Sequence, residues 1–144
     1  MAPKVVTYTD EHFDGVRTLW EQAFPNPKPW NAPEYTVSKK LAAQPNLFIV
    51  AVDGDRVIGS AMAGYDGTRG WLYAVAVLEA YRRRGTGSAL VHEAERRLLD
   101  LGCAKINLQV QSSNADVSDF YKHLGYEVEE RISMGKSVGR FAKP

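Results

Sequence analysis

The chain has 144 residues, and its 44% hydrophobic, 10% aromatic and 24% charged residues are typical of one globular domain rather than of a disordered segment. With 18 Lys and Arg residues against 17 Asp and Glu residues, the net charge of +1 argues against a protein that binds nucleic acid through its bulk charge. A single cysteine excludes an internal disulfide framework, and the lack of a signal sequence or a long apolar run predicts a cytoplasmic, single-domain protein spanning residues 1–144 that does not contact a membrane.

The N-terminal part of the chain predicts one strand and two helices. Residues 4–8 are typical of a strand, and Thr9 and Asp10 can cap the helix that follows. Apolar residues of that helix recur at spacings of three and four, at Phe13, Val16, Trp20 and Phe24. Residues 25–33 contain four prolines and predict an ordered surface loop, after which a weaker helix is expected over residues 34–43.

Three apolar runs in the middle of the chain predict an antiparallel meander. They cover residues 47–52, 56–64 and 71–78. The segments Asp53-Gly54-Asp55 and Asp66-Gly67 separate them and favour tight turns, because aspartate and glycine readily adopt the backbone conformations that hairpins need.

The C-terminal part predicts a return to helices and strands. Residues 85–101 have one apolar face and predict a helix, and residues 105–111 alternate strictly, as a half-buried strand does. Asn114 can cap a short helix that ends at Gly125, and residues 126–138 are expected to supply one or two last strands. This order of elements predicts an α/β (α+β) fold on a mixed sheet.

The most informative segment for function is residues 71–88. A fully apolar strand leads into a basic loop, two glycines and the start of a helix. Gly85 and Gly87 allow close approach of a ligand, and the free N–H groups of a first helical turn attract anions. The segment therefore predicts a phosphate site made mainly of backbone, the alternative being a glycine-rich turn beside solvated arginines. The lysine of a P-loop is absent, and Leu90 stands where a dinucleotide fingerprint has its third glycine.

Two motifs resemble those of the GNAT superfamily of acyl-CoA-dependent N-acyltransferases. Arg82-Arg83-Arg84-Gly85-Thr86-Gly87 follows a strand that ends at Val77 and is similar to the family's Gln/Arg-x-x-Gly-x-Gly/Ala signature. The second motif runs loosely from Asn114 through Tyr121 to Gly125-Tyr126, and the element order is similar over nearly the whole chain. The chain departs from the family at Glu79, where the family often has proline.

The resemblance implies a mixed, mostly antiparallel sheet of six to seven strands with helices on both faces, and acetyl-CoA as acyl donor without a metal. It implies that the backbone of Val75, Ala76 and Val77 binds the pantetheine arm like an extra strand, with the N–H of Val77 polarising the thioester carbonyl. Asn114 would contact the pantetheine, and Tyr121 would face the thiolate as general acid. The pyrophosphate would be held by Arg82, Arg83, Arg84, Gly85, Thr86, Gly87 and Ser88.

Two roles are less clear from the residues themselves. Tyr121 also fits a helix core beside Phe120 and Leu124. The general base is not identified, because Gln109 stands where some protein N-terminus acetyltransferases of the superfamily have glutamate. The remaining candidates are Asp66, Glu34, Glu79 or a chain of waters. The three histidines are typical of exposed positions, Cys103 is typical of packing, and no residues have the spacing of metal ligands.

On the substrate side, the expected lining residues are Trp30, Asn31, Tyr65, Asp66 and Arg69, although the segment Tyr65-Asp66-Gly67 is explained equally well as a hairpin turn. The function predicted is transfer of an acetyl group to a primary amine, of a small molecule or a protein N-terminus, by direct attack.

The alternatives are a non-catalytic acyl-CoA-binding regulator and an RNA-binding domain using Arg82–Arg84, Arg96 and Arg97, which the net charge disfavours. No nucleic-acid partner is expected, and a homodimer is left open. The sequence does not identify the amine or the preferred acyl chain.

Overall fold

The computed structural model describes residues 3–144 and divides the chain into two compact units, Met1–Gln109 and Val110–Pro144. The first unit carries a sheet and three α-helices, and the second carries one α-helix. Among the described residues no helix is long and apolar enough to cross a membrane.

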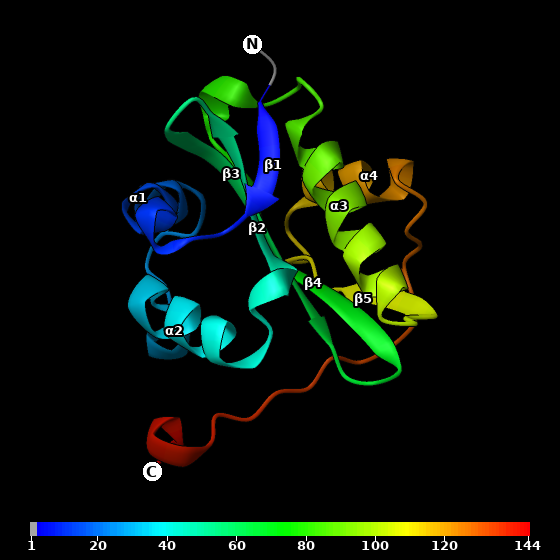
Figure 1. Cartoon of the computed structure of the whole chain (residues 1–144). Coiled ribbons are helices and arrows are strands. Elements are labelled where there is room, and N and C mark those ends of the chain that lie inside the picture. The colour runs from blue at the N-terminus through cyan, green and yellow to red at the C-terminus, as the bar shows by residue number, and fades with distance from the viewer. Residues whose placement is uncertain (1–2) are drawn as a thin grey trace. The chain divides into compact units, whose positions relative to one another are not determined.

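The sheet of the first unit has the strand order β1-β2-β3-β4-β5 (Figure 1). Neighbouring strands are antiparallel, except β4 and β5, which are parallel. The strands are β1 (Lys4–Thr7), β2 (Phe48–Asp53), β3 (Arg56–Tyr65), β4 (Arg69–Val77) and β5 (Lys105–Leu108). The predicted meander and mixed sheet are therefore confirmed, with strand ends that differ by one to three residues.

Helices cover both faces of this sheet. Figure 1 shows α1 (Phe13–Ala23) and α2 (Pro33–Ala43) on one face and α3 (Thr86–Asp100) on the other. The helix expected to begin near Thr9 starts instead as a short 3-10 turn. Residues 3–144 also contain the 3-10 helices η1 (Asp10–His12), η2 (Pro29–Asn31), η3 (Pro45–Leu47), η4 (Glu79–Tyr81) and η5 (Gly139–Phe141).

At some positions the helices and the sheet pack so closely that only glycine fits. A Cβ atom at Gly15 of α1 would lie 2.7 Å from a Val57 side-chain carbon, and one at Gly70 of β4 would lie 2.6 Å from a Leu98 side-chain carbon of α3. Both distances are shorter than carbon atoms tolerate, so a larger residue at either position would force the neighbouring side chain to move.

A chain of buried hydrogen bonds links α1 to the middle of the sheet. The Trp20 indole N–H donates to Ser60 Oγ at 2.9 Å, and the Ser60 hydroxyl donates to the Ala74 carbonyl oxygen at 2.8 Å. Trp20 and Ser60 are almost fully buried, so each polar group is satisfied without water. The link holds β4 at the residue where its regular pairing is interrupted.

The second unit begins with an irregular segment and carries α4 (Ala115–His123). Asn114 caps this helix as expected, because its side-chain oxygen accepts a hydrogen bond from Val117 N at 3.3 Å. The prediction of one or two strands over residues 126–138 is wrong: the structure describes five strands in residues 3–144, not six to seven. Alternating apolar residues predict a strand only where a neighbouring strand completes the hydrogen-bonded ladder.

Candidate active site

Strand β4 is interrupted at Ala74, where the segment expected to bind pantetheine begins. Ala74 has a φ of 51°, in the left-handed region, and the pairing with β3 shifts between Ser60 and Met62. Beyond this bulge Val75–Val77 lie next to β3, whereas β5 pairs only with Arg69–Leu72. Within residues 3–109 the backbone of Val75–Val77 therefore has a ladder partner on one side, and its other side is placed to bind an extended ligand as a strand would.

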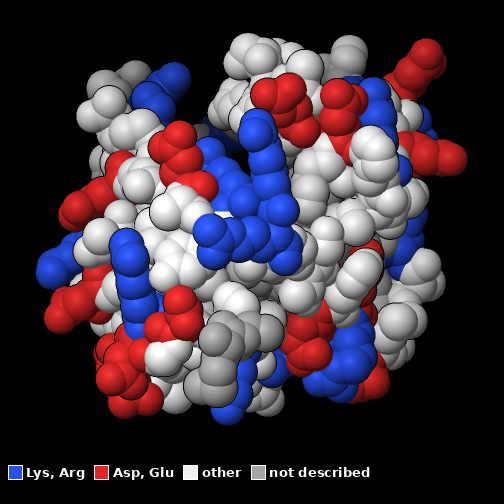
Figure 2. Space-filling model, turned by 90° about the horizontal axis from the view of Figure 1, so that it is seen from above, with Lys and Arg blue, Asp and Glu red and all other residues white. Residues whose placement is uncertain are grey.

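The loop after β4, which we call the arginine loop (Arg82–Ser88), leads directly into α3. Gly85 has a φ of 83° and stands at the N-cap of this helix, a conformation that costs a residue with a side chain about 1–2 kcal/mol. The first turn of α3 contains no acidic residue, and the side chains of Arg82–Arg84 are exposed. On the face that contains the start of α3, Figure 2 shows a gathering of Lys and Arg side chains. The loop therefore offers N–H groups and positive charge to an anion.

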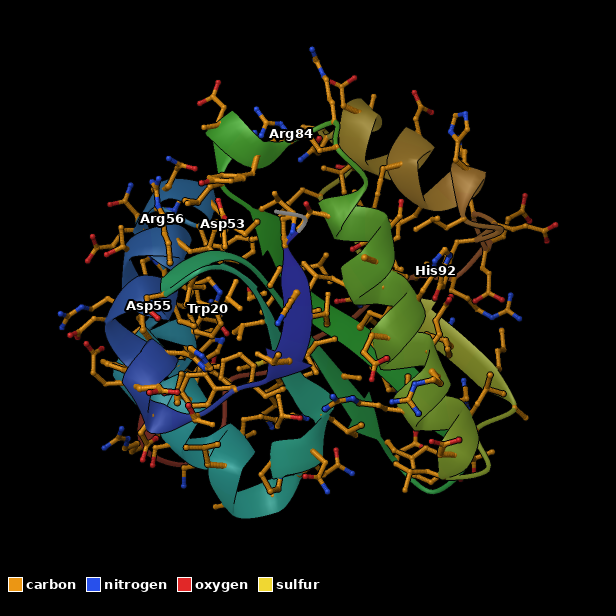
Figure 3. All side chains as sticks on the ribbon, turned by 45° about the horizontal axis from the view of Figure 1, so that its top comes forward. Trp20, Asp53, Asp55, Arg56, Arg84 and His92 are labelled. Atoms are coloured by element: carbon orange, nitrogen blue, oxygen red, sulfur yellow. The ribbon has the colours of Figure 1, made fainter. Side chains whose placement is uncertain are left out.

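Two arginines of this loop are held in place by neighbours. Arg82 Nε donates a hydrogen bond to the Val77 carbonyl oxygen at 3.1 Å. The Arg84 guanidinium lies over the Tyr81 ring at 5.6 Å from its centroid, and the Tyr81 hydroxyl donates to Asp53 Oδ2 at 2.9 Å. Figure 3 shows Arg84 on the loop and Asp53 at the β2–β3 hairpin. The role of Tyr81 cannot be predicted from the sequence, because the β2–β3 hairpin brings Asp53 to its hydroxyl.

A cavity of about 330 Å³ lies along α2 in the first unit; we call it the Lys40 pocket. Its lining residues come from η2, α2, the residue after α2 and β4: Trp30, Asn31, Tyr35, Thr36, Lys39, Lys40, Ala43, Gln44 and Tyr73. The pocket thus brings together two of the five residues expected on the substrate side, Trp30 and Asn31, with a tyrosine one position before the β4 bulge.

Lys40, one of the lining residues, is unusual because only 6% of its surface is exposed. Its ammonium donates to the Ala63 carbonyl oxygen and, at 3.5 Å, to Gln44 Oε1. The nitrogen also lies 5.2 Å from the centroid of the Tyr73 ring. Burial lowers the pKa of Lys40 to about 8, because the charged form loses its hydration. The sequence alone does not point to Lys40, since a lysine among helical residues is normally exposed.

The other expected substrate residues lie around the β3–β4 hairpin. Tyr65 donates its hydroxyl hydrogen to the Gly67 carbonyl oxygen at 2.9 Å, and Asp66 Oδ1 accepts from the backbone N–H groups of Arg69 and Thr68 at 2.8 and 2.9 Å. These hydrogen bonds lower the pKa of Asp66. The same hydrogen bonds stabilise a turn, which accounts for the residues found at this hairpin. A role for Tyr65, Asp66 or Arg69 toward the substrate stays a prediction.

A second cavity, of about 480 Å³, has the opposite charge. Its lining includes Tyr8, Asp10, Phe13 and Glu34. Glu34, one of the candidates for a general base, also lies 3.9 Å from an Arg17 guanidinium nitrogen. It does not line the Lys40 pocket, so the pocket lining supplies no carboxylate that could act as the base. No group of three or more potential metal ligands is found in residues 3–144.

In the second unit, Tyr121 is buried on α4 with 8% of its surface exposed. Its ring makes edge contacts with Phe120 and Tyr126, at centroid distances of 5.0 and 5.7 Å. Burial raises the pKa of its hydroxyl to about 12. The ring thus packs like a core aromatic, and the hydroxyl remains protonated at neutral pH and able to donate a hydrogen bond. The roles of Asn114 and Tyr121 toward a coenzyme stay predictions.

Comparison with known proteins gives consistent matches. Residues 13–126 match the family model for the acetyltransferase (GNAT) family. The chain is 40% identical to an acetyltransferase of Pectobacterium atrosepticum over 131 residues, which cover 91% of this chain and 92% of that protein. It is also 40% identical to an acetyltransferase of Sodalis glossinidius over 129 residues, 90% of each.

Solved structures are similar in fold at lower sequence identity. The structure of AAC(6')-Iy in complex with the bisubstrate analogue CoA-S-monomethyl-acetylneamine has a TM-score of 0.80 at 20% identity, and covers 96% of this chain and 100% of that one. The PaiA N-acetyltransferase of Thermoplasma acidophilum in complex with coenzyme A has a TM-score of 0.76 at 19% identity, over 92% and 94% of the two chains.

Proposed function

The chain belongs to the acetyltransferase (GNAT) family, and from this premise we propose that it moves the acetyl group of acetyl-CoA to a primary amine, of a small molecule or a peptide, without an acyl-enzyme. The observation that carries the proposal is the interrupted strand β4 followed directly by the arginine loop. Within residues 3–109, the end of β4 has a ladder partner on one side only, and the next element offers helix N–H groups with positive charge. This succession suits a long ligand that carries phosphates beyond an extended amide chain.

Residues of the first unit suit two parts of acetyl-CoA, the pantetheine arm and the pyrophosphate. The backbone of Val75–Val77 is placed to hydrogen-bond an extended amide chain, because β5 pairs only with the earlier part of β4. The N–H groups at the start of α3 and the guanidiniums of Arg82–Arg84 would hold the pyrophosphate. We propose that the N–H of Val77 polarises the thioester carbonyl, so that the acetyl carbon accepts the amine more readily.

In the proposed reaction the amine nitrogen forms a bond to the acetyl carbon as the carbon–sulfur bond breaks. The electron pair of that bond leaves with the sulfur as a thiolate, and the amine loses one proton to water. Tyr121 would stabilise the departing sulfur through its hydroxyl. Because its pKa is about 12 and that of a thiol is about 8.5, complete proton transfer is uphill by about 5 kcal/mol. Tyr121 would therefore act as the acid chiefly by donating a hydrogen bond.

The proposal is tested in two steps with the full chain. Calorimetry measures the affinity for acetyl-CoA, and a coupled assay measures coenzyme A release over a panel of amino acids, polyamines, aminoglycosides and peptides. Mass spectrometry should then find an acceptor heavier by one acetyl group. Tight binding without turnover on any amine would favour the alternative of a non-catalytic acyl-CoA-binding regulator, and no binding at all would overturn the proposal.

A further inference from the structure

We propose that the Lys40 pocket selects acceptor amines that carry a carboxylate beside an apolar or aromatic body, with Lys40 as the carboxylate-binding residue. This inference rests on the proposed function, since it names the acceptor class of the same reaction. It concerns specificity, which neither the family match nor a fold similarity at 20% identity shows.

The buried ammonium of Lys40 has fewer hydrogen-bond acceptors than N–H donors. A protonated lysine has three N–H donors. Two of them are directed to Ala63 O and Gln44 Oε1, and no carboxylate of residues 3–144 forms an ion pair with Lys40. A buried cation without a counter-charge is unfavourable, and burial accordingly lowers its pKa. A carboxylate that enters the pocket would supply both the third hydrogen-bond partner and the missing charge.

The lining of the Lys40 pocket is positively charged. None of the nine lining residues is acidic, and Lys39 adds a second ammonium, 5.4 Å from the centroid of the Tyr35 ring. The titratable groups that line the pocket are Tyr35, Lys39 and Lys40 of α2 and Tyr73 of β4, so at neutral pH its charge is positive. A polycationic acceptor would meet like charge there. The pocket therefore differs in expected specificity from a site for neamine, to which the analogue bound by AAC(6')-Iy is related.

The lining of the pocket also has an aromatic part, which includes one residue of β4. Trp30, Tyr35 and Tyr73 are three aromatic residues that line the same cavity. Tyr73 immediately precedes Ala74, where β4 is interrupted before the proposed acetyl-CoA segment. An acceptor held by its carboxylate and its apolar body would thus lie next to the strand residues that are proposed to bind the donor, which favours the geometry of direct attack.

The test compares L-phenylalanine with L-phenylalanine amide, which have the same shape but differ in the carboxylate charge. In the wild-type protein we expect a KM for the acid at least tenfold lower than for the amide. Lys40→Met should raise the KM of the acid at least tenfold, leave that of the amide within threefold, and leave acetyl-CoA affinity unchanged. Lys4→Met, an exposed lysine on β1, is the matched control and should change none of these values.

Measurements over a range of pH test whether the charge of Lys40, rather than the shape of the pocket, determines the KM of the acid. Burial lowers the pKa of Lys40 to about 8, so we expect most Lys40 side chains to lose their proton between pH 7 and 9. The KM of the acid should therefore rise with pH, whereas that of the amide should not follow. Lys40→Arg, which keeps its charge throughout this range, should abolish the rise.

The outcomes that overturn the inference differ from those that overturn the proposed function. Equal KM values for acid and amide, or acetylation of the amide or of spermidine in preference to the acid, would overturn the inference while acetyl transfer stands. So would failure of the acid to be acetylated or to bind calorimetrically. Absence of acetyl-CoA binding would overturn the proposed function itself. If Lys40→Met does not fold, the wild-type comparison of acid and amide decides alone.

Discussion

The arginine loop and the Lys40 pocket are both cationic, but they are built in opposite ways. The loop presents three consecutive, exposed arginines and a helix N-terminus, all within seven residues of sequence. The pocket has one lysine at 6% exposure, held by atoms of β3 and of the residue that follows α2, and lined by residues from 30 to 73. Exposed charges attract anions of many kinds, whereas a buried charge favours the one anion that fits.

We expect the arginine loop to contribute mainly to binding affinity and the Lys40 pocket mainly to the choice of ligand. A ligand bound by the loop meets exposed guanidiniums and backbone N–H groups, so the charge of the ligand dominates its binding. A ligand in the pocket must fit between Trp30, Tyr35 and Tyr73 and satisfy one donor. We therefore expect the two regions to respond differently to mutation, pH and salt.

The largest expected effect is the loss of acetyl-CoA binding in Gly87→Glu. The new side chain, in the first turn of α3, would occupy the space proposed for the phosphates and place a negative charge beside them. We expect the Kd measured by calorimetry to rise at least about 10³-fold, since both a steric and a charge term oppose binding. His92→Glu adds the same charge at an exposed position further along α3 and should have little effect (Figure 3). Equal affinity in Gly87→Glu with an intact fold would place the coenzyme elsewhere.

The next effect concerns Tyr121, which belongs to neither region. Tyr121→Phe keeps the ring contacts with Phe120 and Tyr126 and removes only the hydroxyl. We expect turnover to fall by roughly 10²-fold, the low end for a lost acid, while the affinity for acetyl-CoA is retained. Phe120→Leu, a change beside it that leaves the hydroxyl in place, serves as control. A decrease of less than about threefold, with chemistry limiting, would assign Tyr121 to packing alone.

A smaller effect is expected on stability, and it arises from Lys40. Its pKa is lowered from 10.5 in the unfolded chain to about 8, so between these values the unfolded state binds more protons and folding becomes more favourable as pH rises. From pH 7 to 9 the gain is about 1.4 kcal/mol. Urea unfolding of the wild-type protein and of Lys40→Met at pH 7 and pH 9 isolates this contribution. The difference in free energy of unfolding between the two proteins should change by about 1.4 kcal/mol from pH 7 to 9. An unchanged difference would show that the lysine titrates normally.

The smallest effect is that of salt. Acetyl-CoA affinity should fall about fivefold between 0.05 and 0.5 M NaCl, because the charges of Arg82–Arg84 are exposed and are screened. The KM of a carboxylate-bearing acceptor should change less than twofold, because Lys40 is buried. Equal salt dependence of the two values would remove the distinction between the regions.

The sequence by itself determined the parts of this protein whose causes are local. Alternating and helical apolar spacings, together with the turn chemistry of Asp53-Gly54-Asp55 and Asp66-Gly67, predicted the meander and its helices. The arginine loop was recognisable because a strand, a charged loop and a helix N-terminus are consecutive in the chain. The family followed from the same motif, and the comparisons confirm it.

The tertiary structure decided what depends on neighbours far apart in sequence. Residues 126–138 alternate like a strand, yet alternation does not supply a ladder partner, and no strand forms there in the described structure. Tyr81 orders Arg84 only because the β2–β3 hairpin brings Asp53 to its hydroxyl. Lys40 has the spacing of an ordinary helix lysine and becomes a buried cation only because α2 packs it against the Ala63 carbonyl and the Tyr73 ring. Burial is a property of the assembled molecule, and it is burial that changes the chemistry of this lysine.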